Sequence, residues 1–161
     1  MKGNTAASAR RSYMGARSRA EGAGFENIIN SACAYYCSIG LADVEKTPEP
    51  MKPIGSPDRA GRFIACYTKQ AQPDYKGVLR GGKAVNFEAK HTDSDRMTAD
   101  RVTPEQAARL TRTEKLGGIA FVLCSFSGRY FYRVPWAVWR DMKRLFGRKY
   151  ITPADLAEYR I

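Results

Sequence analysis

Apolar residues recur at helical spacing in the first quarter of the chain. They follow the i, i+3, i+4, i+7 spacing of a helix that buries one stripe, at Phe25, Ile28, Ile29, Ala32, Tyr35, Tyr36 and Ile39. Gly40 can end this helix. Residues 46–57 contain four prolines and must be extended or irregular, because proline cannot donate a backbone hydrogen bond to a helix or to a central strand.

Four later segments favour β-strands. Residues 61–69 read as one strand, and the Gly81-Gly82 pair is typical of a hairpin turn that leads into a second strand over residues 84–90. Residues 118–126 form a nearly continuous apolar run, as expected of a strand that is covered on both faces. Ser127-Gly128 can then turn the chain into a strand over residues 129–134.

Helix signals lie between and after these strands. Thr103-Pro104-Glu105-Gln106 supplies an N-cap, a first-turn proline and a capping-box glutamine, so a helix is predicted to about Leu116. A second helix is expected to begin at Pro135, and Thr152-Pro153 caps a last short one. The polar stretch from His91 to Arg101 is expected to be a loop. In the helix after Pro135, the predicted inward residues are Val138, Trp139, Met142, Leu145 and Phe146, and the outward ones are Arg140, Lys143 and Arg144.

Charge adds a partner class to this α/β pattern. The 161 residues include 27 Lys and Arg against 16 Asp and Glu, which gives a formal net charge of +11 and a pI near 9.7. Such an excess indicates a polyanionic partner, and nucleic acid is favoured over a membrane because no stretch approaches the length of a spanning helix. The alternative is a basic protein whose charge serves solubility alone.

The basic residues gather in two places. Residues 1–20 carry Lys2, Arg10, Arg11, Arg17 and Arg19 with no acid, and they read as a flexible basic N-terminal arm, although a mitochondrial transit peptide has a similar composition. Residues 129–149 contain seven basic residues against the single acid Asp141. Both clusters are expected to line a DNA-binding surface.

Candidate chemistry lies between Asp74 and Lys90. In a strand, successive side chains alternate between faces at about 3.3 Å per residue, so Glu88 and Lys90 share one side while Val85, Phe87 and Ala89 form the buried face. Two carboxylates and an amine can hold a divalent cation and position the water that it activates. The alternatives are a turn-forming Asp74 and a solvated strand face whose charges pair in water.

The same residues carry a family resemblance. Pro73-Asp74 followed by Glu88-Ala89-Lys90 matches the PD-(D/E)xK pattern of the restriction-endonuclease-like nucleases. Asp74–Gly77, Phe87–Lys90, Lys46–Pro50 and Gly118–Val122 resemble, in order and spacing, the RecU-type Holliday junction resolvases, from about Arg17 to Tyr132. The resemblance implies an α/β, restriction-endonuclease-like fold, a mixed β-sheet flanked by α-helices, with residues 21–161 forming a single nuclease domain.

The resemblance also implies a set of site residues. Asp74, Glu88 and the main-chain carbonyl of Ala89 would bind Mg²⁺ or Mn²⁺, Lys90 would orient or deprotonate the attacking water, and Glu26 fits an acid that the first helix often contributes. For contacts with DNA, the family's arginine region, Lys-Gln pair and helix glutamine match Arg17, Arg19, Lys69, Gln70 and Gln106. Further candidates for DNA contacts are Lys76 and, from the second basic cluster, Arg140, Lys143 and Arg144. For each of these residues, the alternative is a solvated surface charge.

The predicted function is a Mg²⁺-dependent endonuclease that resolves Holliday junctions as a homodimer by paired cuts, with no membrane and no small-molecule cofactor beyond the metal. The segment from Pro48 to Asp74, which in the family contributes a stalk that threads the junction, is a few residues shorter here. Alternatives are a nuclease for duplex or flap DNA and a non-catalytic DNA-binding protein with a vestigial site. With no secretion signal, no CxxC pair and one histidine, we expect a cytoplasmic protein whose four cysteines are reduced and mostly buried.

Overall fold

A computed structural model of the chain describes residues 4–48, 50–67 and 72–161, and for residues 4–14, 17–19 and 67 it describes the backbone alone. The helices are α1 (Asn4–Ser38), α2 (Pro104–Lys115), α3 (Trp136–Arg140) and α4 (Met142–Phe146), and the 3₁₀ turns are η1 (Ala99–Arg101) and η2 (Pro153–Tyr159). The strands are β1 (Ala42–Lys46), β2 (Met51–Ile54), β3 (Ile64–Tyr67), β4 (Tyr75–Leu79), β5 (Lys83–Thr92), β6 (Met97–Thr98), β7 (Ile119–Phe126), β8 (Tyr130–Pro135) and β9 (Tyr150–Ile151).

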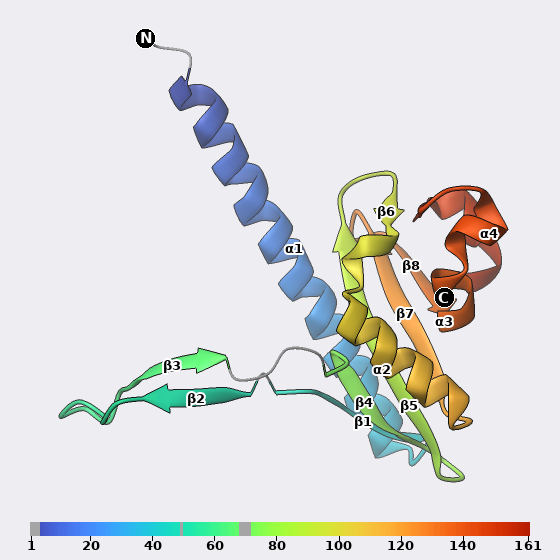
Figure 1. Cartoon of the computed structure of the whole chain (residues 1–161), viewed down its shortest axis with the longest axis horizontal. Coiled ribbons are helices and arrows are strands. Elements are labelled where there is room, and N and C mark those ends of the chain that lie inside the picture. The colour runs from blue at the N-terminus through green and yellow to red at the C-terminus, as the bar shows by residue number, and fades with distance from the viewer. Residues whose placement is uncertain (1–3, 49, 68–71) are drawn as a thin grey trace.

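A five-stranded mixed sheet in the order β1-β4-β5-β7-β8 forms the centre of the fold (Figure 1). Neighbouring strands run antiparallel except β5 and β7, which are parallel and are joined by a crossover that includes α2. The tight β4–β5 hairpin turns at Gly81 and Gly82, whose φ angles of +90° and +83° require glycine. The predicted mixed sheet flanked by helices is therefore confirmed.

Helices cover both faces of this sheet. On one face, Phe25 and Ile29 of α1 pack against Tyr75, Val85 and Phe87. On the other face, α2, α3 and α4 enclose a larger core whose most buried members include Leu110, Val122, Cys124, Phe126, Val134, Trp136, Trp139 and Met142. The face of β5 that carries Glu88 and Lys90 is therefore not a solvated face, because it lies beneath α2.

The first helix is longer than its apolar stripe predicts. Its backbone is helical from Asn4, so residues 4–20 continue into α1 instead of beginning separately from it. Alanine and arginine, which are frequent in this segment, are strong helix formers and account for the extension. Figure 1 shows this part of α1 extending beyond the sheet. The flexibility of residues 1–20 stays a prediction.

Two further predictions were wrong in part. Residues 91–101 are not a plain loop: β5 continues to Thr92, and Met97, which is fully buried, pairs in β6 with Ile151 of β9. The helix expected after Pro135 is divided at Asp141 into α3 and α4. The break rotates the apolar stripe, so that Met142 is buried while Leu145 is 46% exposed.

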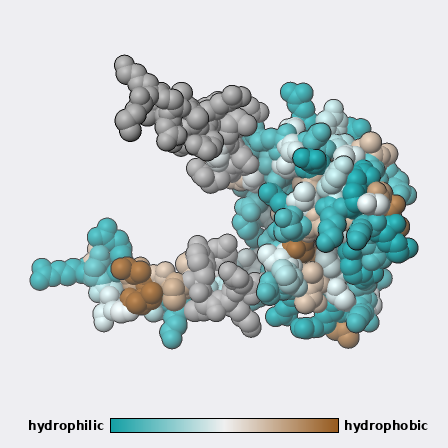
Figure 2. Space-filling model, turned by 45° about the horizontal axis from the view of Figure 1, so that its top comes forward, coloured by the Kyte–Doolittle hydropathy of each residue, from teal (hydrophilic) through white to brown (hydrophobic). Residues whose placement is uncertain are grey.

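The proline-rich segment enters a projecting hairpin. Strands β2 and β3 pair only with each other, and in Figures 1 and 2 this hairpin extends away from the sheet. Apolar side chains remain exposed on it, at Met51, Ile54, Phe63 and Ile64. The strand predicted over residues 61–69 begins only at Ile64 and lies outside the main sheet, and residues 68–69 of this prediction lie outside the described residues.

The cysteine prediction was wrong for most of the thiols. Cys124 is buried in β7, whereas Cys33 is partly exposed and Cys37 and Cys66 are exposed. Burial raises the pKa of the Cys124 thiol. In the described part of the chain, no helix is both long and apolar enough to cross a membrane, even though α1 has 35 residues.

Candidate functional site

Three of the predicted site residues converge at the open end of the β4–β5 hairpin, opposite to its turn. Asp74 directly precedes β4, and Glu88 and Lys90 lie on β5. Tyr75 pairs with Phe87 in the antiparallel register, so Asp74 lies beside Glu88 and Ala89. The alternation of side chains along β5 then directs both Glu88 and Lys90 toward α2.

Short contacts hold the three side chains together. The ammonium Nζ of Lys90 lies 2.9 Å from Oε2 of Glu88 and 3.5 Å from Oδ2 of Asp74. The same Asp74 oxygen accepts a hydrogen bond of 3.0 Å from the backbone N–H of Ala89. The predicted grouping of two carboxylates and one amine is thus present in the fold.

Gln106 connects α2 to this group. Its Oε1 accepts a hydrogen bond of 3.1 Å from the backbone N–H of Thr103, which completes the capping box of α2. Its Nε2 donates a hydrogen bond to Oε2 of Glu88. The cap therefore fixes the orientation of the amide that holds the carboxylate.

Glu88 is the most strongly perturbed carboxyl of the group. Its side chain is completely buried, and burial raises its pKa to about 8, with a further upward contribution from the Asp74 carboxylate that Lys90 offsets in part. Its second oxygen, Oε1, is buried, and in the residues that the structure describes it has no hydrogen-bond partner. In contrast, the Asp74 side chain is 33% exposed and meets solvent.

This arrangement suits a hard divalent cation. Two carboxylates that face each other, one of them with a buried oxygen that lacks a partner, gain from a positive charge placed between them. Carboxylate oxygens are the ligands that Mg²⁺ and Mn²⁺ prefer. The residues present therefore fit the predicted ion, and the ligand role of the Ala89 carbonyl stays a prediction.

Glu26 makes a different primary contact from the one that was predicted. Its carboxylate pairs with Nζ of Lys46 at 2.6 Å, on the α1 side of the sheet. It also lines an open pocket of about 300 Å³ together with Ala89, Lys90, Arg101 and other residues of α1 and β5. Glu26 is thus near the end of β5, and its role as a metal ligand stays a prediction.

The predicted DNA-binding residues are spread over the chain. The side chains of Arg17 and Arg19, and all of Lys69 and Gln70, lie outside the described residues. Lys76 is exposed on β4, two residues from Asp74, and its Nζ donates to Gln72 at 3.2 Å.

The C-terminal basic cluster lies farther from the carboxylates. Arg140 pairs with Glu114 at 2.6 Å, near the end of α2 opposite to Gln106, which is about 12 Å away at 1.5 Å per residue. Arg144 pairs with Asp141 at 2.9 Å. Lys143 is exposed on α4 and directly precedes Arg144 in the sequence. These three residues are not brought to the carboxylate group.

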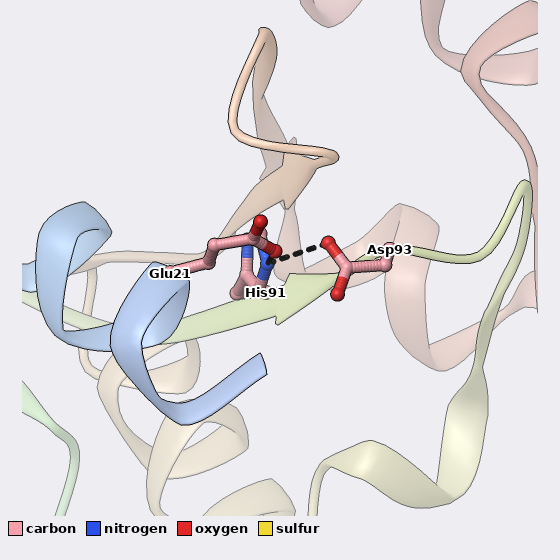
Figure 3. Close-up of side chains that lie close together, drawn as sticks. All are labelled: Glu21, His91 and Asp93. Carbon is pink, nitrogen blue, oxygen red and sulfur yellow. Dashed lines mark hydrogen bonds and ion pairs between the residues drawn. The ribbon is translucent and has the colours of Figure 1, made fainter. Parts of the chain in front are cut away.

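Other residues at the site were not predicted. Arg101 donates a hydrogen bond of 2.8 Å to the carbonyl of His91 and lines the same pocket as Lys90. Glu21, His91 and Asp93 form a second polar cluster beside it (Figure 3). An alternating His91-x-Asp93 pattern at the end of a strand was the only signal in the sequence, because Glu21 is far away along the chain.

Comparisons with known proteins agree with the geometry. The model of the RecU family, described as Recombination protein U, matches residues 20–161. The Holliday junction resolvase RecU of Streptococcus gordonii is 36% identical over 108 residues, which make up 64% of this chain and 54% of that protein. The protein of the same name from Bacillus pumilus is 31% identical over 141 residues, 83% of this chain and 68% of that protein. The chain thus spans little more than half the length of the first of these relatives.

A solved structure shares the fold. Hjc, a Holliday junction resolvase from Archaeoglobus fulgidus, aligns with a TM-score of 0.50 at 12% sequence identity, over 87% of this chain and 89% of that chain. At this identity, the likeness bears on the fold alone.

Proposed function

The chain belongs to the RecU family, and from this premise we propose that it is a divalent-metal-dependent endonuclease that resolves four-way DNA junctions. The observation that carries the proposal is the convergence of Asp74, Glu88 and Lys90 around a buried carboxylate whose pKa is raised to about 8. Structural ion pairs are seldom built this way, because burying a second acid beside the first is costly.

Each residue of the group has a distinct part in this proposal. Asp74 and Glu88 would hold Mg²⁺, or Mn²⁺ in its place, with the carbonyl of Ala89 as a further oxygen ligand and Glu26 at the edge. When bound, the ion would lower the pKa of a water and neutralise charge on the phosphate. Lys90 would orient or deprotonate that water, and Gln106 positions Glu88 by its hydrogen bond.

Basic residues near the carboxylates would grip the DNA backbone. Lys76 and Arg101 flank the site on β4 and η1, and the basic arm supplies Arg17 and Arg19. Lys69, Gln70, Arg140, Lys143 and Arg144 would extend the contact along the duplex arms. Because neutralised phosphates release counterions, binding should weaken steeply as salt rises.

Selectivity for a junction would come from the β2–β3 hairpin. A two-stranded hairpin with exposed Ile54, Phe63 and Ile64 buries no face of its own, which favours insertion among unpaired bases at the open centre of a junction. Its basic residues, Lys52, Arg59 and Arg62, suit the phosphates around that centre.

The working form would be a homodimer. A four-way junction is pseudosymmetric and must be cut on two strands, so two copies related by a twofold axis supply one site to each strand. On α1 and directly after it, three exposed apolar residues, Ile28, Tyr35 and Ile39, favour contact with a second copy. Sedimentation of the free protein would test this state.

Cleavage of matched substrates tests the proposal. The wild type with Mg²⁺ should cut a synthetic four-way junction faster than a linear duplex of the same sequence. Asp74→Asn and Glu88→Gln should each lower the rate by at least about 100-fold. DNA affinity should be kept in both and increased in Asp74→Asn, which removes a charge that repels phosphate. Asp43→Asn and Glu45→Gln, in exposed acids of the edge strand β1, are the matched controls.

The outcomes separate the three readings of the chain. Unchanged cleavage in both site variants would show that the site lies elsewhere, and binding without cleavage in Mg²⁺ or Mn²⁺ would identify a non-catalytic binding protein. Equal cutting of junction and duplex would agree with a nuclease but contradict selectivity for the junction. Phe63→Ser and Ile64→Ser should lower the affinity for the junction and leave the affinity for the duplex unchanged. Leu116 is 82% exposed at the end of α2, and Leu116→Ser should change neither affinity.

A further inference from the structure

A second polar cluster lies on the other face of β5, one residue beyond Lys90. His91 points toward α1, where Glu21 approaches it, and Asp93 reaches it from the segment that follows β5 (Figure 3). The His91 side chain is 5% exposed, and the two carboxylates are about one third exposed. Two segments, α1 and the end of β5 with the residue that follows it, thus bring three ligand atoms close together.

The distances in this cluster are long for hydrogen bonds. Nε2 of His91 lies 3.3 Å from Oδ1 of Asp93 and 3.5 Å from Oε2 of Glu21, whereas N–H···O bonds fall at about 2.7–3.2 Å. One ring nitrogen also carries at most one proton, so hydrogen bonds to both carboxylates would have to share it.

The same distances fit the ligands of a tetrahedral metal ion. With metal–ligand bonds of about 2.0–2.2 Å, as for zinc, the edges of a tetrahedron are about 3.3–3.6 Å long. All three ligand atoms of the cluster lie within 4.8 Å of one another. The two distances from Nε2 of His91 therefore match edges of one coordination sphere, and the partly exposed carboxylates leave this sphere accessible to solvent.

Buried neighbours orient the imidazole ring for this role. Nδ1 of His91 lies 3.1 Å from Oγ of Ser125, which is completely buried on β7. When Nδ1–H donates to this hydroxyl, Nε2 presents its lone pair toward the two carboxylates, an arrangement that a cation bound between them would stabilise. The guanidinium of Arg101 donates to the carbonyl of His91 at 2.8 Å and fixes the backbone.

We propose that Glu21, His91 and Asp93 form a second metal site, which binds a divalent transition metal of the zinc class. An imidazole with two carboxylates suits Zn²⁺, and Mn²⁺ less tightly, whereas Mg²⁺ prefers oxygen ligands throughout. The bound ion would join α1 to the end of β5 beside Lys90. The inference does not depend on the proposed nuclease activity, because none of the three ligands belongs to the Asp74–Glu88–Lys90 group.

The single histidine of the chain allows a direct test. The full chain, without a histidine tag and with ¹⁵N-labelled histidine, is titrated with Zn²⁺ in an Asp74→Asn/Glu88→Gln background, which disables the other carboxylate group. Cys37→Ser and Cys66→Ser remove the two exposed thiols that would compete for zinc. The expected result is one Zn²⁺ per chain and a shift of the Nε2 resonance that is complete at one equivalent, with Nδ1 still protonated.

Variants of the ligands complete the test. Glu21→Gln and Asp93→Asn should each weaken zinc binding by at least about tenfold, and Asp95→Asn, two residues from Asp93, should not. Circular dichroism of each variant checks that the fold is kept. If His91→Gln, which alters a buried residue, fails to fold, Glu21→Gln still tests the site because the Glu21 side chain is partly exposed. An Nε2 resonance that does not respond to Zn²⁺, with both ring nitrogens protonated, would identify an imidazolium held between two carboxylates and overturn the proposal.

Discussion

Replacing Glu88 by glutamine should stabilise the metal-free protein while it removes the proposed activity. The wild-type carboxyl has a pKa of about 8 in the fold, against an ordinary value of 4.5, so between these values the folded state holds a proton that the unfolded state has lost. The free energy of unfolding therefore falls as pH rises through this interval. Glutamine keeps the size and hydrogen-bonding oxygen of the side chain and has no proton to lose.

The size of the effect follows from proton linkage. For one group with a pKa of 4.5 unfolded and about 8 folded, the loss of stability between about pH 5 and pH 8 is about 3 kcal/mol. Glu88→Gln has no such loss, so its free energy of unfolding relative to that of the wild type should increase by about 3 kcal/mol between about pH 5 and pH 8. This corresponds to a difference of about 10 °C in Tm.

Urea unfolding in EDTA at several pH values measures this difference. Other titrating groups are common to both proteins, so their contributions cancel when the two stabilities are subtracted. Saturating Mg²⁺ should then stabilise the wild type and leave Glu88→Gln nearly unchanged. A stability difference that does not vary with pH, or a variant less stable than the wild type at pH 8, would refute the account of Glu88 as a buried acid held beside Asp74. Glu45→Gln, on the exposed edge strand, is the control and should show no such trend.

Three further predictions test the surroundings of the site. Mg²⁺ affinity should rise with pH until about pH 8 and then level off, with a proton released on binding, which calorimetry in buffers of different ionisation enthalpy measures. Gln106→Glu keeps the capping box but replaces the donor to Glu88 with an acceptor, so cleavage should fall at least about tenfold even at saturating Mg²⁺, because Glu88 is no longer held in place. An unchanged rate at saturating Mg²⁺ would contradict the positioning role. Gly77→Ala would overlap the carbonyl oxygen of Asp43 and lie 2.6 Å from Cα of Val44, so it should cost at least about 3 kcal/mol of unfolding free energy, whereas Gly24→Ala on α1 has open space and should gain about 0.5–1 kcal/mol.

Local signals in the sequence predicted the elements that form the carboxylate site. The Gly81-Gly82 turn set the hairpin, the alternation along β5 paired Glu88 with Lys90, and the capping box at Thr103 fixed the start of α2. These features depend on neighbours within a few residues, and hydrogen bonds within the same segment determine them.

Features that depend on distant contacts could not be predicted in this way. The alternation of β5 was compatible with a solvated polar face, and only the packing of α2 against β5 buries Glu88 and raises its pKa. The apolar stripe after Pro135 did not indicate the division of the helix at Asp141, and of its predicted inward residues Met142 is buried whereas Leu145 is 46% exposed. The contact of Glu21 with His91 joins residues that no spacing rule relates, since they meet only when α1 packs across the sheet.

The parallel pairing of β5 with β7 links the two clusters. Lys90 lies opposite Cys124 and His91 opposite Ser125, and both partners are completely buried, so the end of β5 cannot shift without disrupting the core. Because successive side chains of a strand point to opposite faces, this one register directs Lys90 toward the α2 face and His91 toward the α1 face. A shift of β5 by one residue would exchange its two faces, so that Glu88 and Lys90 would point toward α1 and His91 toward α2. The position of the proposed nuclease site and that of the proposed second metal site are therefore set by the same rigid element.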